Sequence, residues 1–483
     1  MNNGSNARQS LGFSIASHYS VFSFQLISTI VISRLLTPEE IGVFAVAASI
    51  IILSKIVRDY GIANYIIRHQ DISPEILKTC FTLLLAVGFA LGGLTYSMAG
   101  IIGDFFQSAG VTKVLIILAL NFFIMPFGAN TYAYLKKTFC FHQIAIIDIC
   151  SGAVGVLSAI FFAYMGEKYL SLAYSSVLST LTGVIVSKFF KPSWFPNGIG
   201  LSGWKKVVRF SLPLGISGSL SQLAATVIGV LIGRFFGLFE VGIYSRAFST
   251  YSLFDHAIVQ AIRPVMLPAL SRKLLNEGHI CSVYTRTVEM LTGLAWPFYI
   301  WLWFNAESVV YCLYGDQWSE SIQFVKVFCL AGMLNPFIAF YSALFTAFGD
   351  IKRVFRFELV ANLSKIIFIY IACQFELVAV VYAFVFSVFI AMVIGILDYS
   401  QKLNVTAYGF FKVLKKSAVV SIACYLVFIL SDPYLSNFDN LQRLLISLVV
   451  YFITWATSIF LSSHAIKKEL LLLWKVNGGF SKF

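Results

Sequence analysis

Five charged side chains lie inside long apolar stretches of this sequence: Asp148, Arg246, Asp255, Lys326 and Lys365. A charge near the centre of a bilayer costs about 2.5–3.5 kcal/mol on insertion scales, so such residues usually face the protein interior or a watery cavity. Arginine binds phosphate through paired hydrogen bonds, and lysine binds it as a point charge. Arg246 and Lys365 are therefore the preferred candidates for contact with an anionic ligand.

These candidates also have a structural interpretation. Lys365 shares a helical face with Asn362 and Glu358 at spacings of three and four, so a buried ion pair or a snorkelling lysine would explain it as well. Arg246 and Asp255 are nine positions apart, about half a turn out of phase at roughly 100° per residue. They cannot both point into one narrow pathway, so one of them is interpreted as structural.

Polar residues also follow one face of two predicted helices, at 11–33 and 207–233. They are Ser14, His18, Gln25 and Ser28 on the first helix, and Ser211, Gly215, Gln222 and Thr226 on the second. A cavity between two helical lobes would require such stripes, although packing through small residues explains the serines and glycines equally well. A lone histidine is more often structural than a proton carrier. The predicted pathway residues are His18, Gln25, Asp148, Gln222, Arg246, Asp255, Asn362 and Lys365.

The elements that must position these residues are predicted to be transmembrane helices. The chain of 483 residues is 59% hydrophobic and 12% charged, with a mean hydropathy of +0.83, well outside the averages of soluble domains. A helical span takes about 20 apolar residues, and such stretches recur throughout the chain. We predict an all-α polytopic membrane protein with fourteen helices, near 11–33, 40–58, 79–102, 113–135, 143–165, 169–190, 207–233, 239–262, 286–306, 320–346, 356–375, 378–397, 412–430 and 441–463.

The distribution of basic residues predicts the orientation of these helices. Most of the 35 lysines and arginines fall in alternate connecting segments, which the positive-inside rule places in the cytoplasm. Both termini and the segment 191–206 are then cytoplasmic, and the first helix is retained because no cleavage site precedes Arg34. The net charge of +13 needs no nucleic acid to explain it, since those charges would face anionic lipid headgroups.

An internal repeat predicts two lobes. Residues 33–49 align without a gap with residues 233–249, so that Arg34 matches Arg234 and Gly42 matches Gly242. Both segments join the first and second helices of a six-helix block, so the copies have the same orientation and enclose a central cavity. We predict a six-helix lobe over 1–190, an inter-lobe linker over 191–206, a second six-helix lobe over 207–400, and two additional helices with a cytoplasmic tail over 401–483.

Four segments carry a resemblance to a known family: RLLTPEEIG at 34–42, EVGIYSRA at 240–247, RPVMLPALSR at 263–272 and LYGDQW at 313–318. They resemble the polysaccharide and O-antigen unit flippases of the multidrug/oligosaccharidyl-lipid/polysaccharide exporter superfamily. The resemblance implies an alternating-access transporter in the bacterial inner membrane that moves undecaprenyl-pyrophosphate-linked oligosaccharides to the periplasmic face. Membrane lipids and polysaccharide assembly proteins are predicted as further partners. For such a substrate, the positive charges of Arg246 and Lys365 make these two residues the preferred contacts for the headgroup and glycan.

Three other functional classes are alternatives to this one, of which a purely structural scaffold would not need the intramembrane charges. A membrane glycan polymerase should have a large catalytic loop, but the predicted outer loops are short and carry no phosphate loop or metal-ligand cluster, so no enzyme activity and no cofactor are predicted. The eight cysteines form no CxxC pair and are interpreted as packing residues. A cavity rich in carboxylates would favour a drug or metabolite exporter of the same superfamily, whereas the predicted pathway residues of this chain include basic groups.

Prolines inside predicted helices mark places where a helix can bend or break. They are Pro126, Pro213, Pro297 and Pro336. Transporters often use such bends to move, although a bend need not be a hinge.

Overall fold

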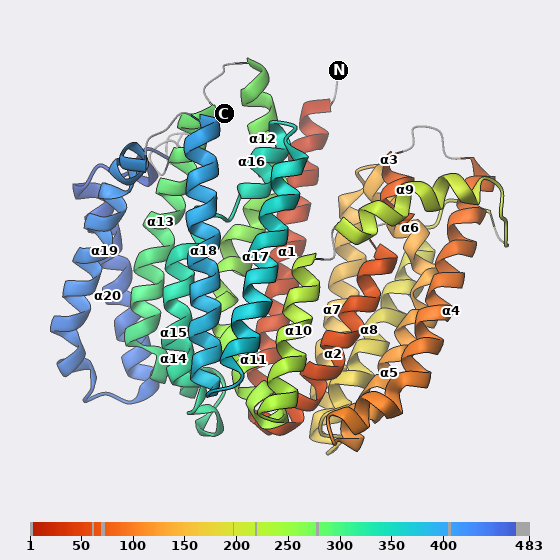
Figure 1. The fold of residues 1–483 in the computed structure, drawn as a ribbon, viewed down its shortest axis with the longest axis horizontal. Helices are drawn as coiled ribbons and strands as arrows, with labels where there is room; N and C mark the ends of the chain where they lie inside the picture. The colour runs from red at the N-terminus through yellow and green to blue at the C-terminus, as the bar shows by residue number, and fades with distance from the viewer. Residues whose placement is uncertain are drawn as a thin grey trace, which may run out of the picture. The chain divides into compact units, whose positions relative to one another are not determined.

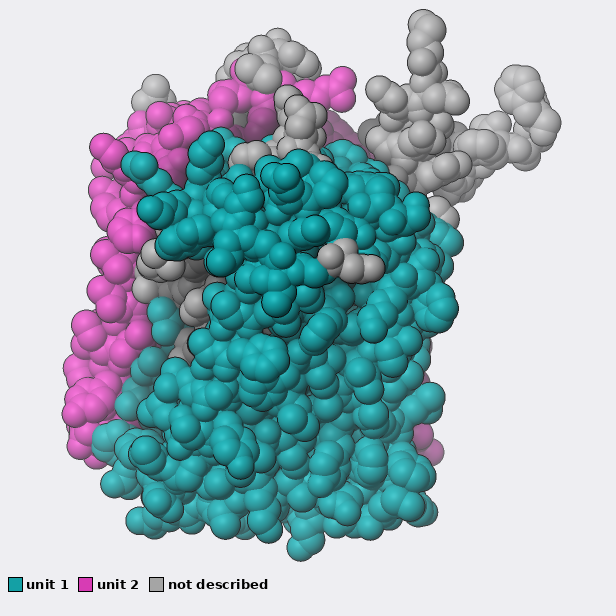
Figure 2. Space-filling view, turned by 90° about the vertical axis from the view of Figure 1, so that its right-hand side faces the viewer, with its two compact units in different colours: residues 1–245 teal, residues 246–483 magenta. Residues whose placement is uncertain are grey.

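The computed structural model describes residues 3–59, 62–68, 73–196, 198–217, 220–276, 280–403 and 407–469. Every regular element within these ranges is a helix (Figure 1). The chain divides into two compact units, Met1–Ser245 and Arg246–Phe483 (Figure 2). The division into two lobes over 1–190 and 207–400, which would move during transport, remains a prediction.

The first unit is built from α1 (Asn3–Leu35), α2 (Pro38–Asp59), α3 (Ile62–Arg68), α4 (Pro74–Phe105), α5 (Ala109–Ile124), α6 (Pro126–Lys137), α7 (Phe141–Tyr164), α8 (Leu170–Phe189), α9 (Trp204–Ser217) and α10 (Leu220–Phe235). α11 (Leu238–Phe254) begins in this unit. The local sequence of the segment 34–42 explains where α2 begins. The Thr37 hydroxyl accepts the Glu40 N–H at 3.3 Å, and the Glu40 carboxylate accepts the Thr37 N–H at 2.9 Å. This reciprocal capping box starts α2.

The second unit continues with a π-helical turn η1 (Asp255–Val259), α12 (Gln260–Asn276), α13 (Ile280–Phe304), α14 (Ala306–Leu313), η2 (Asp316–Trp318), α15 (Ser321–Leu334), η3 (Asn335–Phe337), α16 (Tyr341–Ala347), α17 (Ile351–Ala372), α18 (Leu377–Leu403), α19 (Ala407–Leu435) and α20 (Asn440–Leu461). The two additional helices predicted at the C-terminus are α19 and α20. α19 packs along α13, and α20 packs against α14 and α19.

Where the structure describes them, the fourteen predicted segments are helical apart from short turns, which confirms the all-α polytopic fold class. Within the described residues, seven helices are long and apolar enough to cross a membrane, or eight if α5 and α6 form one bent span. Other helices are too short to pass alone, such as the apolar segment Gln222–Phe235 of α10. The count of fourteen spans therefore stays a prediction.

Prolines break two of the predicted helices. Pro126 begins α6, whose axis is bent by 55° from that of α5. Pro336 lies in the 3-10 turn between α15 and α16, whereas Pro297 lies inside the continuous helix α13. A proline lacks the N–H that continues the helical hydrogen bonds, so Pro126 and Pro336 fall where the helix changes direction or tightens.

The prediction of a single helix over 207–233 is wrong. Its first half belongs to α9, which crosses the ends of the first unit's helices beside α3 and α4, while α10 runs along α2 (Figure 1). The side chains of α9 explain its course. Val207 is buried in an apolar cluster with Tyr65 and Phe195, while Lys205 and Lys206 are exposed. Such an amphipathic helix is stable across the end of a bundle.

The two copies of the repeat meet at the beginnings of α2 and α11. A methyl group added at Gly42 would collide with the Leu238 carbonyl oxygen, and one added at Gly242 would collide with the Pro38 carbonyl oxygen. Positions 42 and 242, and positions 38 and 238, are equivalent in the repeat, so the contact is reciprocal. Only glycine at both positions allows the two backbones to come this close.

Candidate functional site

A cavity of about 640 Å³ lies in the first unit among α6, α7 and α8, and it contains the predicted pathway residue Asp148. The Tyr132 hydroxyl donates to the two carboxylate oxygens of Asp148 at 3.1 and 3.2 Å. Ser17 of α1 also hydrogen-bonds to Asp148. A buried carboxylate requires such partners, because burying it unpaired would cost several kcal/mol.

The bend at Pro126 positions the residues opposite Asp148. Tyr132 and Lys136 lie one turn apart on α6, and the Lys136 ammonium lies 4.8 Å from the Tyr132 ring centroid. Gly128 and Gly183 also line the cavity, and the lack of a side chain at Gly128 allows α6 to pack closely against Val184 and Ser187 of α8. The cavity therefore combines a carboxylate, an ammonium and hydroxyl groups, which is a lining suited to a polar ligand.

Arg246, at the start of the second unit, lies in an aromatic enclosure. Its guanidinium carbon is 5.9 Å from the Tyr314 ring centroid and 5.6 Å from that of Trp318. Arg246 is only 9% exposed, and among the described residues its Nε has no hydrogen-bond partner and its guanidinium forms no ion pair. The Tyr314 hydroxyl is in turn 3.0 Å from that of Thr250. The structure thus holds a buried cation in place by cation–π contacts, without a carboxylate from the part of the chain that it describes.

Lys365 and Asn362 belong to a second polar cluster in the same unit, on α17. The Glu358 carboxylate accepts hydrogen bonds from Asn362 Nδ2 at 3.1 Å and from the Ser342 hydroxyl of α16 at 3.1 Å. The Lys365 ammonium lies 5.3 Å from the Phe384 ring centroid and interacts electrostatically with Glu358. The predicted shared face of these α17 residues is therefore present. Lys365 differs from Arg246 in having a carboxylate nearby.

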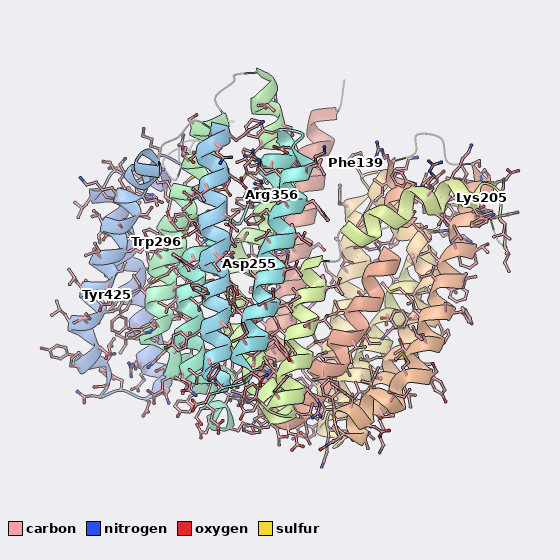
Figure 3. The ribbon with its side chains drawn as sticks, in the orientation of Figure 1. Phe139, Lys205, Asp255, Trp296, Arg356 and Tyr425 are labelled. Carbon is pink, nitrogen blue, oxygen red and sulfur yellow. The ribbon has the colours of Figure 1, made fainter. Side chains whose placement is uncertain are left out.

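Asp255 occupies the first position of the π-helical turn η1, near the middle of the long helical segment that runs from α11 to α12 (Figure 3). Gln260 donates a hydrogen bond from Nε2 to the Asp255 carboxylate at 3.1 Å. The ring of Tyr251, one turn earlier, stacks on Tyr299 at 6.0 Å. A π-turn shifts the phase of the residues that follow it and is frequent at functional sites, whereas Arg246 and Asp255 are joined by the regular helix α11, so their predicted difference in phase stays a prediction.

The polar stripes predicted on the first and seventh helices are only partly described. His18 is half-buried, with its ring 5.5 Å from that of Tyr19, and Gln25 is exposed. Ser211 lies in α9 but Gln222 lies in α10, so the second stripe is divided between two helices. Ser14 and Gly215 lie outside the residues whose side chains are described.

The pathway prediction omitted one buried carboxylate. Asp398 of α18 accepts hydrogen bonds from the Tyr341 hydroxyl at 2.6 Å and from Arg356 at 2.8 Å, and Arg353 approaches it at 3.6 Å. Asp398 directly follows the predicted helix 378–397, so it is not among the charged residues predicted to lie inside a helix. The basic residues between 352 and 356 are the sequence signal that could indicate an acidic partner such as Asp398.

Comparison with known proteins gives one family. The family described as polysaccharide biosynthesis protein matches residues 31–323. The teichuronic acid biosynthesis protein TuaB of Bacillus subtilis (strain 168) is 22% identical over 404 residues, which cover 83% of each chain.

Two solved structures share the fold. The lipid II flippase MurJ, in an inward closed conformation, superposes with a TM-score of 0.72 at 15% identity and covers 93% of this chain and 98% of its own. An inward-facing multidrug resistance MATE family transporter of the MOP superfamily superposes with a TM-score of 0.67 at 18% identity, covering 79% of this chain and 94% of its own. At these identities the likeness shows the fold alone.

Proposed function

Because the chain belongs to the polysaccharide biosynthesis protein family, we propose that it is a flippase that carries lipid-linked oligosaccharide units across the bacterial inner membrane. Two similar proteins support this proposal: TuaB is a teichuronic acid biosynthesis protein, and MurJ, which shares its fold, is a lipid II flippase. Undecaprenyl pyrophosphate is the proposed lipid carrier, and transport proceeds from the cytoplasmic to the periplasmic face by alternating access. In this proposal the protein transports its substrate without making or breaking a covalent bond.

The observation that carries the assignment of an anionic substrate is the buried guanidinium of Arg246. It contacts the rings of Tyr314 and Trp318 and has no carboxylate partner among the described residues. A pyrophosphate would supply the missing negative charge and accept the hydrogen bond that Nε leaves unmade. Lys365, whose positive charge is partly compensated by Glu358, and Asn362, which hydrogen-bonds to Glu358, are assigned to the glycan.

The alternative function is that of a drug or metabolite exporter, because the chain shares its fold with a multidrug resistance MATE family transporter. The cavity around Asp148 favours that reading, because a buried carboxylate would attract a cationic drug. The family match over residues 31–323 favours the polysaccharide reading, since it distinguishes branches that share one fold.

The two readings differ in what a purified protein moves. In vesicles that contain the reconstituted protein, a labelled lipid-linked oligosaccharide should become accessible to a membrane-impermeant enzyme on the far side. A cationic dye should not be expelled. Deletion of the gene should also cause a lipid-linked glycan to accumulate on the cytoplasmic face. Dye export without glycan movement would establish the exporter instead.

A further inference from the structure

Residues 191–196 and 198–206, which connect α8 to α9 and include the first residues of α9, form a strap along the first unit. Ser202 accepts a hydrogen bond through its carbonyl oxygen from the Thr79 hydroxyl at 2.8 Å, and the Gly200 N–H donates to the Thr82 hydroxyl at 2.9 Å. The ring of Phe195 is buried and meets the Tyr134 ring of α6 edge-on at 5.2 Å. The strap therefore has one side attached to α4 and α6 and one side turned outward.

α4 shows where the strap lies relative to a membrane. It is one of the helices able to span, and Phe89, Leu94 and Ile101 are exposed along it. From Thr82 to Phe105 it rises about 35 Å at 1.5 Å per residue, against a hydrocarbon core of about 30 Å. Thr82 thus lies near one headgroup boundary, and the strap that it hydrogen-bonds lies at the same level.

The outward side of the strap exposes apolar residues, and these are followed by basic residues in the first turns of α9. Ile199 is 73% exposed, Leu201 60% and Trp204 43%. The basic residues that follow, Lys205, Lys206 and Arg209, are also exposed. Lys205 lies at the end of α9 that is nearest α4 (Figure 3). The same stretch of α4 contributes Lys78, which packs against Gly200, and one acidic residue, Glu75.

We propose that this outward side binds the headgroups of anionic phospholipids in the adjoining leaflet. Exposed Trp, Leu and Ile at the headgroup level insert into the interface, while Lys and Arg beside them attract anionic lipids. A soluble partner would not explain why the apolar residues lie level with the end of a lipid-facing helix. Through Phe195 and Tyr134 the bound lipid would also hold α6, the helix that carries Tyr132 and Lys136 into the Asp148 cavity.

Lipid retention measured by native mass spectrometry tests this proposal. The protein is placed in nanodiscs of phosphatidylcholine with phosphatidylglycerol, released into detergent, and its bound phosphatidylglycerol counted. The triple variant Lys205→Gln, Lys206→Gln, Arg209→Gln should retain about tenfold less than the parent. The matched control Lys352→Gln, Lys415→Gln, Lys468→Gln removes the same charge from exposed positions of the second unit and should retain most of it. Equal retention by the strap variant and the parent, or an equal loss in both variants, would overturn the proposal.

A second measurement does not depend on the charge variants. Brominated phosphatidylglycerol quenches tryptophan fluorescence only near the bromine, so the parent protein should lose more signal than Trp204→Phe. Brominated phosphatidylcholine should separate the two proteins less. If Trp204→Phe is quenched to the same extent as the parent, the strap does not lie against lipid.

Discussion

Arg246 is the residue on which the proposed substrate chemistry depends most directly. A hydrogen bond to a charged group contributes about 1.5–3 kcal/mol, so Arg246→Ala should reduce transport roughly 10- to 100-fold with normal protein abundance. Arg246→Lys keeps the charge but not the paired donors, and should recover only part of the activity. The measurement is glycan movement per folded molecule in vesicles.

Lys326→Ala is the matched control for Arg246, since the Lys326 ammonium also lies near an aromatic ring, 5.7 Å from that of Trp303. It should transport normally. Full activity of Arg246→Ala would remove Arg246 from the substrate path, and loss of protein together with activity would show a structural role.

His464, which follows α20, gives a second prediction at this scale. Its ring is fully buried against Gly293, with Nε2 3.0 Å from the Ser417 hydroxyl and Nδ1 accepting the Ile466 N–H at 3.3 Å. Burial, with the positive charge of Lys416, lowers the pKa of His464 to about 4 against 6.5 for the exposed side chain. The neutral ring is therefore the form that the fold stabilises.

Because the unfolded chain takes up this proton first, the contribution of His464 to stability is present above pH 6.5 and is lost as the pH falls toward about 4. The thermal unfolding midpoint in detergent should fall more steeply between pH 6.5 and 5 for the parent than for His464→Gln. Parallel curves for the two proteins would contradict this assignment.

At the scale of elements, the crossing of α2 and α11 is where the repeat affects packing. Gly42→Ala or Gly242→Ala places a methyl group against a carbonyl oxygen of the other helix, and overpacking of this kind costs about 1–3 kcal/mol. Each variant should lower both the unfolding temperature and the transport rate. Because the contact is reciprocal, the two variants should have similar effects.

Gly93→Ala in α4 is the control for both variants, since no atom lies within 4 Å of the added methyl group. It should be neutral or slightly stabilising, because alanine favours helix more than glycine does. If Gly42→Ala behaves like Gly93→Ala, the backbones do not approach as closely as the structure places them.

At the scale of the whole molecule, the basic residues predict that both termini and the strap face the cytoplasm. A reporter that is active only in the cytoplasm should work when fused at Lys205 or after Phe483, and a periplasmic reporter should not. A fusion in the loop after Phe105 should give the reverse result, since α4 is long enough to cross the membrane. A periplasmic signal at Lys205 would refute the predicted orientation.

The sequence by itself determined the helical class, the approximate positions of most helical segments and the repeat, but not the division of 207–233 into α9 and α10. These properties are local or periodic, because each apolar run must satisfy its own backbone in lipid. The buried charged residues could also be identified from the sequence, since a charge inside an apolar segment is costly and usually has a structural or functional role. The motif at 34–42 pointed to the family that the match over 31–323 establishes.

Only the tertiary structure decided the partners of those charges. Asp148 accepts a hydrogen bond from Tyr132 because the bend at Pro126 turns α6 toward α7. A proline in the sequence indicates that a helix can bend there but does not determine the angle of the bend. Arg246 meets Trp318, 72 positions away, because α11 packs near η2. The course of α9 likewise depends on contacts with α3 and α4. Such contacts join residues far apart in the chain, and a pattern of neighbouring residues carries no record of them.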